Sequence, residues 1–385
     1  MLHPSTTLTR RDMIKGSVTL AAAAFAQYPL SLFGGPEAEE GGVQIPFLDP
    51  QPPVKRQIRW EELRHWHTPT DDLYVVSHYN TPALEADKHT LEISGLVRKP
   101  RTLTLGEIKA RRRRTIFATL ECGGNGNSPG FMGAVGNVTW TGTPLAPLLR
   151  ECGLLKRGIE VVFFGLDEKV ETVRQKDYPQ NFARSLHVID AQRDDILLCY
   201  EMNGQPLTRE HGFPLRLVVP GWYGIAWVKW LNRIEVIDRR YMSKYMAREY
   251  VTLRGEERDG KTIWRETSVG PMNVKSILAR VVRLREGTLR LTGAAWTDGT
   301  PLRTVEVRLN DGAWMPARLD RTRRSKFSWT FWTFDWTNPP AGEHSLVSRA
   351  IDVEGRVQPA ADDPAIRLKK TYWESNQQVV RRVRI

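Results

Sequence analysis

The sequence has only three cysteines and lacks the short motifs that mark most metal and nucleotide sites. An odd, small number of cysteines excludes a framework of disulfides. There is no C-x-x-C, no HExxH and no G-x-x-x-x-G-K-[ST], and the eight histidines show no cluster by spacing. Cys152 ends a helix-like stretch and Cys199 lies in an apolar strand, so we expect both to be buried free thiols.

Acidic residues are fewer than basic ones, 44 against 56, and the formal net charge is +12. Such a balance raises the question of nucleic-acid binding. The basic residues are scattered, apart from the run Arg111–Arg114, and no zinc-finger or RNA-binding signature is present. We therefore expect no nucleic-acid partner, and the surplus fits an anionic ligand or an acidic partner protein.

The N-terminus carries an export signal. Arg10 and Arg11 precede the short apolar segment GSVTLAAAAFAQ, and Ala24-Phe25-Ala26 has the small-x-small form of a cleavage site. This pattern predicts a twin-arginine signal over residues 1–26 and a periplasmic protein exported in folded form. Gln27 and Pro29 interrupt the apolar run, so we expect no membrane span in the mature chain, with an uncleaved anchor as the alternative.

The rest of the chain divides into three parts that differ in composition and in the pattern of apolar residues. Residues 27–58 are rich in Pro, Gly and Glu and predict a linker or extended arm. Residues 59–268 mix short strands and helices without regular βαβ spacing, which indicates an α+β domain. From 269 to 385 apolar and polar residues alternate, and Asp311-Gly312 is a strong hairpin signal. This part predicts an antiparallel β-sandwich of immunoglobulin-like type.

Cys122 is the cysteine that calls for a chemical explanation. It follows the apolar run TIFATLE and opens a loop, CGGNGNSPG, that has little side chain around it. A cysteine nucleophile would need a nearby base, for which His78, His187 and His211 are candidates. The other interpretation is a thiolate ligand of a soft metal whose remaining ligands come from an organic cofactor. The glycines would then let the backbone approach a bulky group.

A second group of residues points to an anionic ligand. The segment HGFPLRLVVPGWYGIAWVKWL contains His211, Arg216 and Lys229 around an apolar strand. Cations beside a strand are usually surface residues. Placed around two glycine turns, three donors could instead hold a phosphate, with each charged hydrogen bond worth roughly 1.5–3 kcal/mol.

Four segments together resemble the sulfite oxidase family of mononuclear molybdenum enzymes: ECGGNG, WTGTPLAPLL, LLCYEMNGQPLTREHGFPLRLVVPG and VKWLNRIEV. The resemblance extends over about residues 60–385. It implies a molybdopterin-binding α+β domain over 59–268, followed by an immunoglobulin-like dimerisation domain over 269–385, and hence a homodimer. The cofactor it implies is molybdenum-molybdopterin. The implied reaction is two-electron oxygen-atom transfer, with a small anionic sulfur compound such as sulfite as the substrate.

The resemblance also assigns the residues of the cofactor site. Cys122 matches the thiolate ligand of molybdenum, and Asn125 matches the asparagine of the family's C-x-G-N loop. Four further residues match contacts around the pterin phosphate: His78, His211, Arg216 and Lys229.

Two residues are carried over as catalytic residues on the substrate side. Tyr250 falls where the family has its active-site tyrosine, with Tyr241 and Tyr245 as competing neighbours. Arg382 falls where the family brings a substrate-binding arginine back to the metal, with Arg381 competing for the role.

Two departures put the substrate in doubt. Sulfite oxidases have arginines where this chain has Val76 and Asn127. A unit charge pair at 4 Å is worth roughly 4 kcal/mol at an effective dielectric of 20, so their loss would weaken the binding of a small dianion. Sulfane dehydrogenase subunits also lack the arginine after the cysteine. Either the substrate is not free sulfite, or another cation, such as Arg174 or Arg184, replaces them.

The sequence contains no C-x-x-C-H haem motif, flavin fingerprint or iron–sulfur cysteines. We therefore expect no haem, flavin or Fe–S centre in this chain and a separate electron acceptor, a c-type cytochrome. A sulfane dehydrogenase subunit and a sulfoxide-type reductase are the alternatives on the same site. An immunoglobulin-like binding protein without enzyme activity is the alternative from another class.

Overall fold

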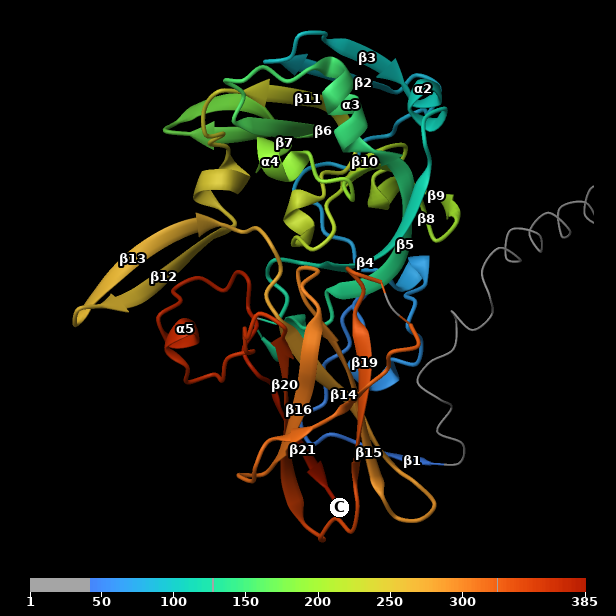
Figure 1. Ribbon diagram of the computed structural model, residues 1–385, viewed down its shortest axis with the longest axis vertical. Helices are drawn as coiled ribbons and strands as arrows, with labels where there is room; N and C mark the ends of the chain where they lie inside the picture. Colours follow the sequence, from blue (N-terminus) through green and yellow to red (C-terminus); the bar gives the residue numbers. More distant parts are fainter. Residues whose placement is uncertain (1–41, 127, 324) are drawn as a thin grey trace, which may run out of the picture.

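The computed structural model describes residues 42–126, 128–323 and 325–385. The predicted signal over 1–26, with Arg10 and Arg11, lies outside the described residues, and so does Asn127. Figure 1 shows two parts stacked along the long axis, a mixed part above and a sandwich of strands below.

The upper part is built on two sheets. The first has the strand order β3 (Arg101–Thr104), β2 (Thr90–Gly95), β11 (Leu231–Ile237), β6 (Glu160–Val173), β7 (Lys176–His187). Its β2 and β11 are parallel, and its other neighbours are antiparallel. The second sheet has the order β10 (Arg216–Val218), β8 (Leu197–Met202), β5 (Val135–Pro144), β4 (Arg114–Glu121), with β9 (Gln205–Pro206) added to β8.

The helices are short and lie between these strands. Thr104 and Glu107 form the predicted capping box at the start of α2 (Leu105–Lys109), since each side chain bonds the other's backbone N–H. The other α-helices are α3 (Leu145–Cys152), α4 (Val188–Ala191) and α5 (Pro364–Arg367). Single turns complete the set: η2 (Trp60–Glu62), η3 (Thr70–Asp72), η4 (Pro129–Phe131), η5 (Arg209–His211), η6 (Gly224–Ala226) and η7 (Lys244–Arg248).

The lower part is an antiparallel sandwich. One sheet has the order β1 (Val43–Ile45), β14 (Lys275–Arg283), β15 (Leu289–Trp296), β19 (Thr330–Trp336), β18 (Arg318–Leu319). The other has the order β17 (Met315–Pro316), β16 (Leu302–Leu309), β20 (Glu343–Asp352), β21 (Val380–Arg384). Asp311-Gly312 lies in the turn between the paired strands β16 and β17, as its sequence predicts. The predicted fold class, an α+β part followed by an immunoglobulin-like sandwich, is confirmed.

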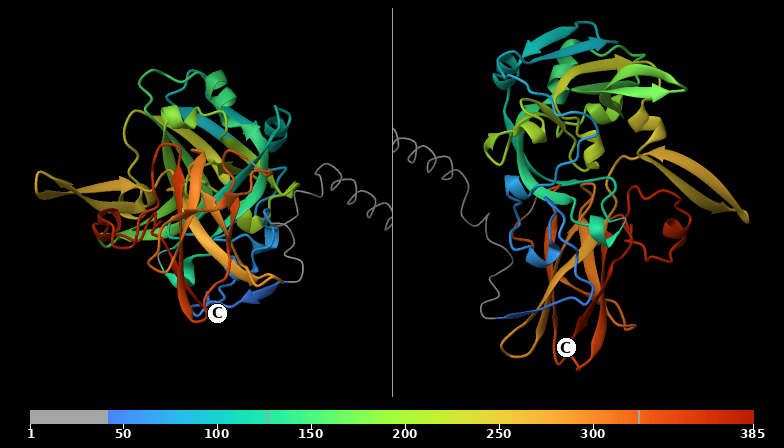
Figure 2. Two further views of the ribbon diagram at one scale, coloured as in Figure 1. Left: turned by 60° about the horizontal axis from the view of Figure 1, so that its bottom comes forward. Right: turned by 180° about the vertical axis from the view of Figure 1, so that it is seen from behind.

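Two segments extend from these layers. The arm before the α+β part pairs with the sandwich, because β1 joins β14 and Phe47 bridges Val383 of β21. The hairpin of β12 (Val251–Arg258) and β13 (Lys261–Ser268) forms a sheet of its own and projects from the side of the molecule (Figure 2).

Tryptophans extend the core of the α+β part into the adjoining end of the sandwich, which has a second core of its own. Trp60 from η2 is fully buried and stacks on Trp296 of β15 at 5.9 Å between ring centroids. Trp66 and Trp329 each donate an indole N–H to the other's carbonyl oxygen, at 3.0 and 2.8 Å. Aromatic pairs of this kind add about 0.5–1.5 kcal/mol beyond the area that they bury. The joint therefore fixes how the sandwich sits against the α+β part.

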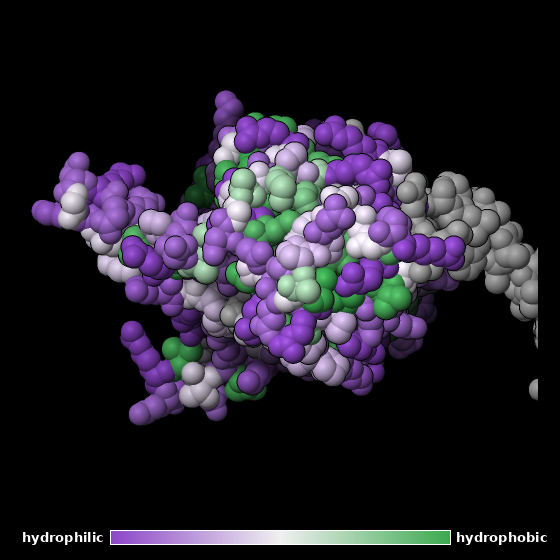
Figure 3. Space-filling view, turned by 90° about the horizontal axis from the view of Figure 1, so that it is seen from below, coloured by the Kyte–Doolittle hydropathy of each residue, from purple (hydrophilic) through white to green (hydrophobic). Residues whose placement is uncertain are grey.

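The surface shows no dominant apolar face at the sandwich end. In Figure 3 hydrophilic residues cover most of this end, and hydrophobic residues form small separate areas. No helix within the described ranges has the length and apolar character needed to cross a membrane.

We expect Trp60→Ala to lower the free energy of unfolding by about 3–5 kcal/mol, because it leaves a large cavity at the joint. Urea unfolding would measure the loss. Trp264→Ala is the matched control, since that indole is nearly half exposed on the projecting hairpin and should cost less than about 1 kcal/mol. Equal losses in the two variants would contradict a structural role for the joint.

Candidate functional site

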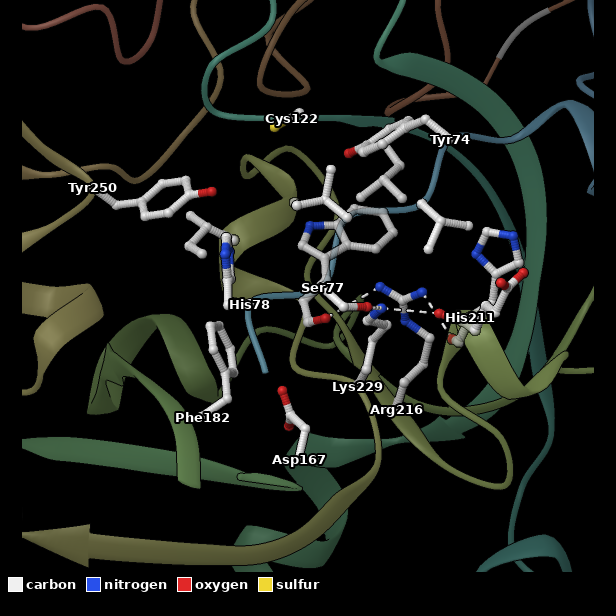
Figure 4. A pocket seen from close by; sticks show the side chains of 17 residues that line it. Tyr74, Ser77, His78, Cys122, Asp167, Phe182, His211, Arg216, Lys229 and Tyr250 are labelled. Carbon is white, nitrogen blue, oxygen red and sulfur yellow. Dashed lines mark hydrogen bonds between the residues drawn. The ribbon is translucent and has the colours of Figure 1, made fainter. Parts of the chain in front are cut away.

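A pocket in the α+β part collects nearly all of the residues that the sequence singles out (Figure 4). Its empty space amounts to about 610 Å³, part of which is open to solvent. The end of β4, the strands β6 and β7, and the loops around η5 and η6 form its walls. Its lining includes Tyr74, His78, Cys122, Asp167, Phe182, His211, Arg216, Lys229 and Tyr250.

Cys122 lies directly after β4, with its side chain at one side of the pocket (Figure 4). Its backbone N–H donates to the carbonyl of Ala134 at 2.9 Å, and its own carbonyl accepts from Asn125 N–H at 2.9 Å. Only 7% of the residue is exposed, and burial raises the pKa of its thiol to about 11. The free thiol is therefore protonated at neutral pH. The other two cysteines are buried and do not line the pocket.

Three basic residues gather on the side of the pocket away from Cys122 (Figure 4). Arg216 starts β10 and donates to the carbonyls of His211 and Trp227 at 3.0 and 3.1 Å. Lys229 donates to Ser77 Oγ at 2.6 Å and to the carbonyl of Glu210 at 2.9 Å. Neutral oxygens therefore accept the hydrogen bonds of both cations.

The pKa values of this cluster show excess positive charge in a desolvated place. Burial, reinforced by Arg216, lowers the pKa of Lys229 to about 7. Burial also lowers the pKa of Arg216 to about 10, and burial together with the two cations lowers the pKa of His211 to about 3. An anion bound among these side chains would raise all three values, so the site suits a phosphate.

Aromatic rings pack around His78 at the pocket. His78 stacks on Phe182 at 5.6 Å and on Tyr245 at 4.7 Å, and these two rings also lie 5.0 Å from each other. Burial lowers the pKa of the His78 imidazole to about 4. Tyr250 meets His78 edge-on at 5.2 Å and stacks on Trp373 at 3.9 Å.

Tyr250 is the tyrosine of the competing three that lines the pocket. Tyr245 packs behind His78, and Tyr241 packs on Phe164. Tyr250 also has a φ of 54°, a strained backbone conformation for a tyrosine, of the kind that concentrates at functional sites. A β-carbon on Gly123 would lie 3.3 Å from its ring, so the glycine permits this close contact.

Tyr74, Asp167 and Trp373 are among the residues of the site that were not predicted from the sequence. Tyr74 and Asp167 line the pocket, and Trp373 backs Tyr250. Asp167 ends an apolar segment of β6, and burial raises the pKa of its carboxyl to about 7. A carboxylate directly after the apolar run VVFFGL was the only sequence signal for any of them.

Other predicted residues lie outside the pocket. Asn125 is almost fully buried, but its amide donates to Glu121 Oε1 at 3.0 Å and accepts from Ala134 N–H at 2.9 Å, which braces the loop. Arg382 lies on the exposed face of β21, where its N–H donates to Asp49 Oδ1 at 3.0 Å. Its neighbour Arg381 points inward and pairs with Glu61 at 2.5 Å. β21 belongs to the sandwich, and neither arginine lines the pocket.

Arg174 and Arg184, which were considered as replacements for the two missing arginines, do not reach the pocket. Arg174 sits in the turn between β6 and β7, with a φ of 50°. Arg184 is buried, but its guanidinium donates to the carbonyls of Tyr245 and Val269. Neither of them lines the pocket.

Comparison with known proteins gives two family matches. Residues 78–245 match the oxidoreductase molybdopterin binding domain, and residues 266–373 match the Mo-co oxidoreductase dimerisation domain. The two matches coincide with the α+β part and most of the sandwich.

Individual relatives are similar over most of the chain. Mitochondrial sulfite oxidase of Drosophila melanogaster is 31% identical over 323 residues, covering 76% of this chain and 55% of that protein. Sulfite oxidase of Gallus gallus is 29% identical over 382 residues, covering 91% and 80%. The chain thus spans little more than half the length of the Drosophila protein. The crystal structure of the sulfane dehydrogenase SoxCD from Paracoccus pantotrophus superposes with a TM-score of 0.71 at 26% identity, covering 94% of this chain and 98% of that one.

The residues of the pocket fit a molybdopterin group. A thiol is a soft donor that can bind a metal as the thiolate, and Cys122 provides one at one side of the pocket. The cation cluster offers a place for a phosphate at the other side. Asp167 Oδ1 and Arg216 Nε are buried without a hydrogen-bond partner within the described part of the chain, so polar atoms remain for the ring and the phosphate.

We expect Asp167→Asn to change the pH dependence of stability in the cofactor-free protein. An unfolded aspartate has a pKa near 3.9 and the folded one about 7, so the folded state binds more protons between these values. The contribution of Asp167 to stability is therefore full below about pH 4 and is lost as the pH rises to about 7.

Unfolding free energies measured from pH 4 to 8 would test this expectation. The difference between Asp167→Asn and the parent should grow in favour of the variant as the pH rises. Exposed Asp71→Asn is the control. A difference that stays constant with pH would contradict the raised pKa.

Proposed function

Because the chain belongs to the sulfite oxidase family of molybdenum enzymes, we propose that it is a molybdenum-dependent oxidoreductase that acts on a sulfur compound. The observation that carries this proposal is the pocket itself. It places one soft thiol, Cys122, opposite a buried cluster of cations, Arg216 and Lys229.

Cys122 is the residue that would bind the metal, and the cluster of His211, Arg216 and Lys229 would hold the phosphate of the pterin. Because the pKa of the thiol is about 11, binding must release its proton to solvent. When bound, molybdenum-molybdopterin supplies two-electron oxygen-atom transfer to the substrate.

Tyr250 would act on the substrate side. Burial raises the pKa of Tyr250, so its phenol stays protonated and can donate a hydrogen bond to a substrate oxygen. The imidazole of His78, with a pKa of about 4, is neutral at pH 7 and cannot contribute positive charge.

A sulfane-type substrate fits the site better than free sulfite. Of the described lining residues, Arg216 and Lys229 are the only arginine and lysine, and both lie away from Cys122 (Figure 4). Val76 lines the pocket. Sulfite oxidases have an arginine at this position. A small dianion that binds beside Cys122 loses its hydration and contacts aromatic rings instead of fixed positive charges. This desolvation makes its binding unfavourable. The similarity to a sulfane dehydrogenase supports the same choice.

The rival chemistry, with Cys122 as a nucleophile, has less support. A catalytic thiol has a lowered pKa, whereas burial raises this one. His187 caps α4 on the exposed surface, and His78 is packed against the rings of Phe182 and Tyr245. A binding protein without enzyme activity does not require basic residues on the opposite side of a pocket from a thiol.

We propose a periplasmic homodimer that passes its electrons to a separate c-type cytochrome. The dimerisation domain supports the dimer. The twin-arginine pattern of the sequence supports the location, and the lack of a haem motif in the sequence supports the separate acceptor. A sulfoxide-type reductase on the same site would draw electrons from a donor instead.

We expect Cys122→Ser to abolish turnover and to lower the bound molybdenum strongly, because an alkoxide is a poor substitute for a thiolate donor. Metal analysis of the purified protein and steady-state kinetics would measure both. Cys199→Ser, a buried thiol outside the pocket, is the control. Full molybdenum content in Cys122→Ser would remove this residue from the metal.

The same preparations can identify the substrate. Sulfite and an organic persulfide with a single negative charge are offered with an oxidised cytochrome, and dimethyl sulfoxide with a reduced dye. Because the pocket has no fixed positive charge beside Cys122 for a dianion, a sulfane-type enzyme should show a higher kcat/KM for the persulfide than for sulfite. The opposite order would restore sulfite as the substrate, and dye oxidation by the sulfoxide would favour the reductase.

The export proposal is tested at Arg10 and Arg11, which lie outside the described residues. Lysine at both positions should leave folded, cofactor-loaded protein in the cytoplasm, because the route reads the arginine pair. Cell fractionation with metal analysis of each fraction would show it. Unchanged periplasmic levels would indicate another route.

A further inference from the structure

The loop after Cys122 is held by residues that come from the far end of the chain. The carbonyl of Gly123 accepts from Glu374 N–H at 2.7 Å. The carbonyl of Gly126 accepts from Gln377 Nε2 at 3.0 Å. Between them, the carbonyl of Asn125 accepts from Lys275 Nζ at 2.9 Å. Three loop carbonyls therefore depend on donors from β14 and from the segment before β21.

Lys275 is the central donor of this arrangement. It is the first residue of β14, and its ammonium also donates to Ser375 O and to Glu121 Oε1, both at 2.8 Å. The side chains of Lys275 and Glu121 are only 2% and 0% exposed. The second carboxylate oxygen of Glu121 accepts from the indole of Trp296 at 2.8 Å. Every donor of the ammonium and both carboxylate oxygens thus have partners.

A buried ion pair of this kind needs an explanation other than stability. Taking both charges out of water costs about as much as their attraction returns, and apolar replacements are often neutral or stabilising. What the pair does provide is a fixed position, because three donors on one nitrogen define where the neighbouring groups lie. Glu121 directly precedes Cys122, and the carbonyl of Asn125 lies three residues after it.

The loop is also shaped to let Lys275 in. Gly126 has a φ of +88°, and a β-carbon there would lie 2.7 Å from Lys275 Nζ. A side chain at this position would be strained and would push the ammonium away. The loop and the lysine therefore fit together from both sides.

We propose that Lys275 is a positioning residue that sets the place of the Cys122 thiol, so that the sandwich completes the site of the α+β part. The proposal rests on Cys122 being the metal ligand. It assigns the sandwich a role in the chemistry in addition to dimerisation. Lys275 itself does not line the pocket, and it acts through the backbone of the loop.

The test uses the full chain and compares variants on both sides of the contact. Lys275→Met removes the donor and leaves Glu121 unpaired. The double variant Glu121→Gln/Lys275→Met removes both charges, so it should fold even if the single variant does not. Gly126→Ala disturbs the same contact from the loop. Arg356→Met is the control, because it leaves the buried carboxylate of Asp352 without its cation in the sandwich, away from the loop.

The main measurement is the rate at which iodoacetamide alkylates Cys122 in cofactor-free protein, read by peptide mass analysis. In the three test variants we expect it to rise at least about tenfold, equal to about 1.4 kcal/mol of lost protection. The same variants should retain less molybdenum and lose kcat with little change in KM. Arg356→Met should match the parent in alkylation and metal content, whatever its effect on the unfolding temperature.

Two results would overturn the proposal. One is an alkylation rate in the folded double variant within about twofold of the parent. The other is an equal rise in Arg356→Met, which would show a general loosening instead of a positioning role. Because alkylation is measured without the cofactor, a parent protein that binds no molybdenum would refute the proposed function and still leave this comparison readable.

Discussion

The packing of tryptophans between the two parts is the constraint on which the site depends. Trp60 and Trp66 come from the segment before the first sheet, and Trp296 and Trp329 come from the sandwich. Stacked rings and reciprocal hydrogen bonds allow little sliding, so the sandwich holds one orientation. The loop after Cys122 receives hydrogen bonds from sandwich residues. The geometry of this loop therefore depends on how firmly the tryptophans hold the sandwich against the α+β part.

A second constraint is electrostatic. Arg216 is buried and Lys229 is partly buried beside it, and their hydrogen bonds go to neutral oxygens. Desolvation of two like charges is unfavourable in the absence of a ligand, and it lowers the pKa values of both side chains. Backbone carbonyls and the indole of Trp230 at 4.4 Å stabilise the charges partly. The remaining positive potential is what an anionic cofactor can use, so the fold gives up some stability for binding.

The sequence was informative where chemistry depends on neighbours along the chain. The capping box of Thr104 and Glu107, the turn at Asp311-Gly312 and the strand that delivers Cys122 are local features, and the structure contains each of them. The resemblance also selected His78, His211 and Lys229, and the structure places these three residues in one pocket.

What the sequence could not supply depends on contacts between distant segments. Trp373 reaches Tyr250 only through the packing of the chain end. Asp167 gains its raised pKa from burial that no local pattern reveals. Arg381 and Arg382 both lie on β21 of the sandwich and outside the pocket, and the place of this strand depends on pairing with β20, which a motif at the chain end does not reveal.

The hydrogen bonds of the Cys122 loop also have a consequence for the order of events in the cell. Their donors, Lys275, Glu374 and Gln377, are made long after the cysteine itself. Once the ribosome has passed Lys229, the basic residues of the pocket have been made. The residues whose hydrogen bonds hold the loop after Cys122 have not yet been made. Since domains fold as their residues emerge, the two sides of the pocket mature at different times. A chain truncated before Gln377 would therefore contain the basic residues of the pocket and would lack one of the donors that hold the loop after Cys122.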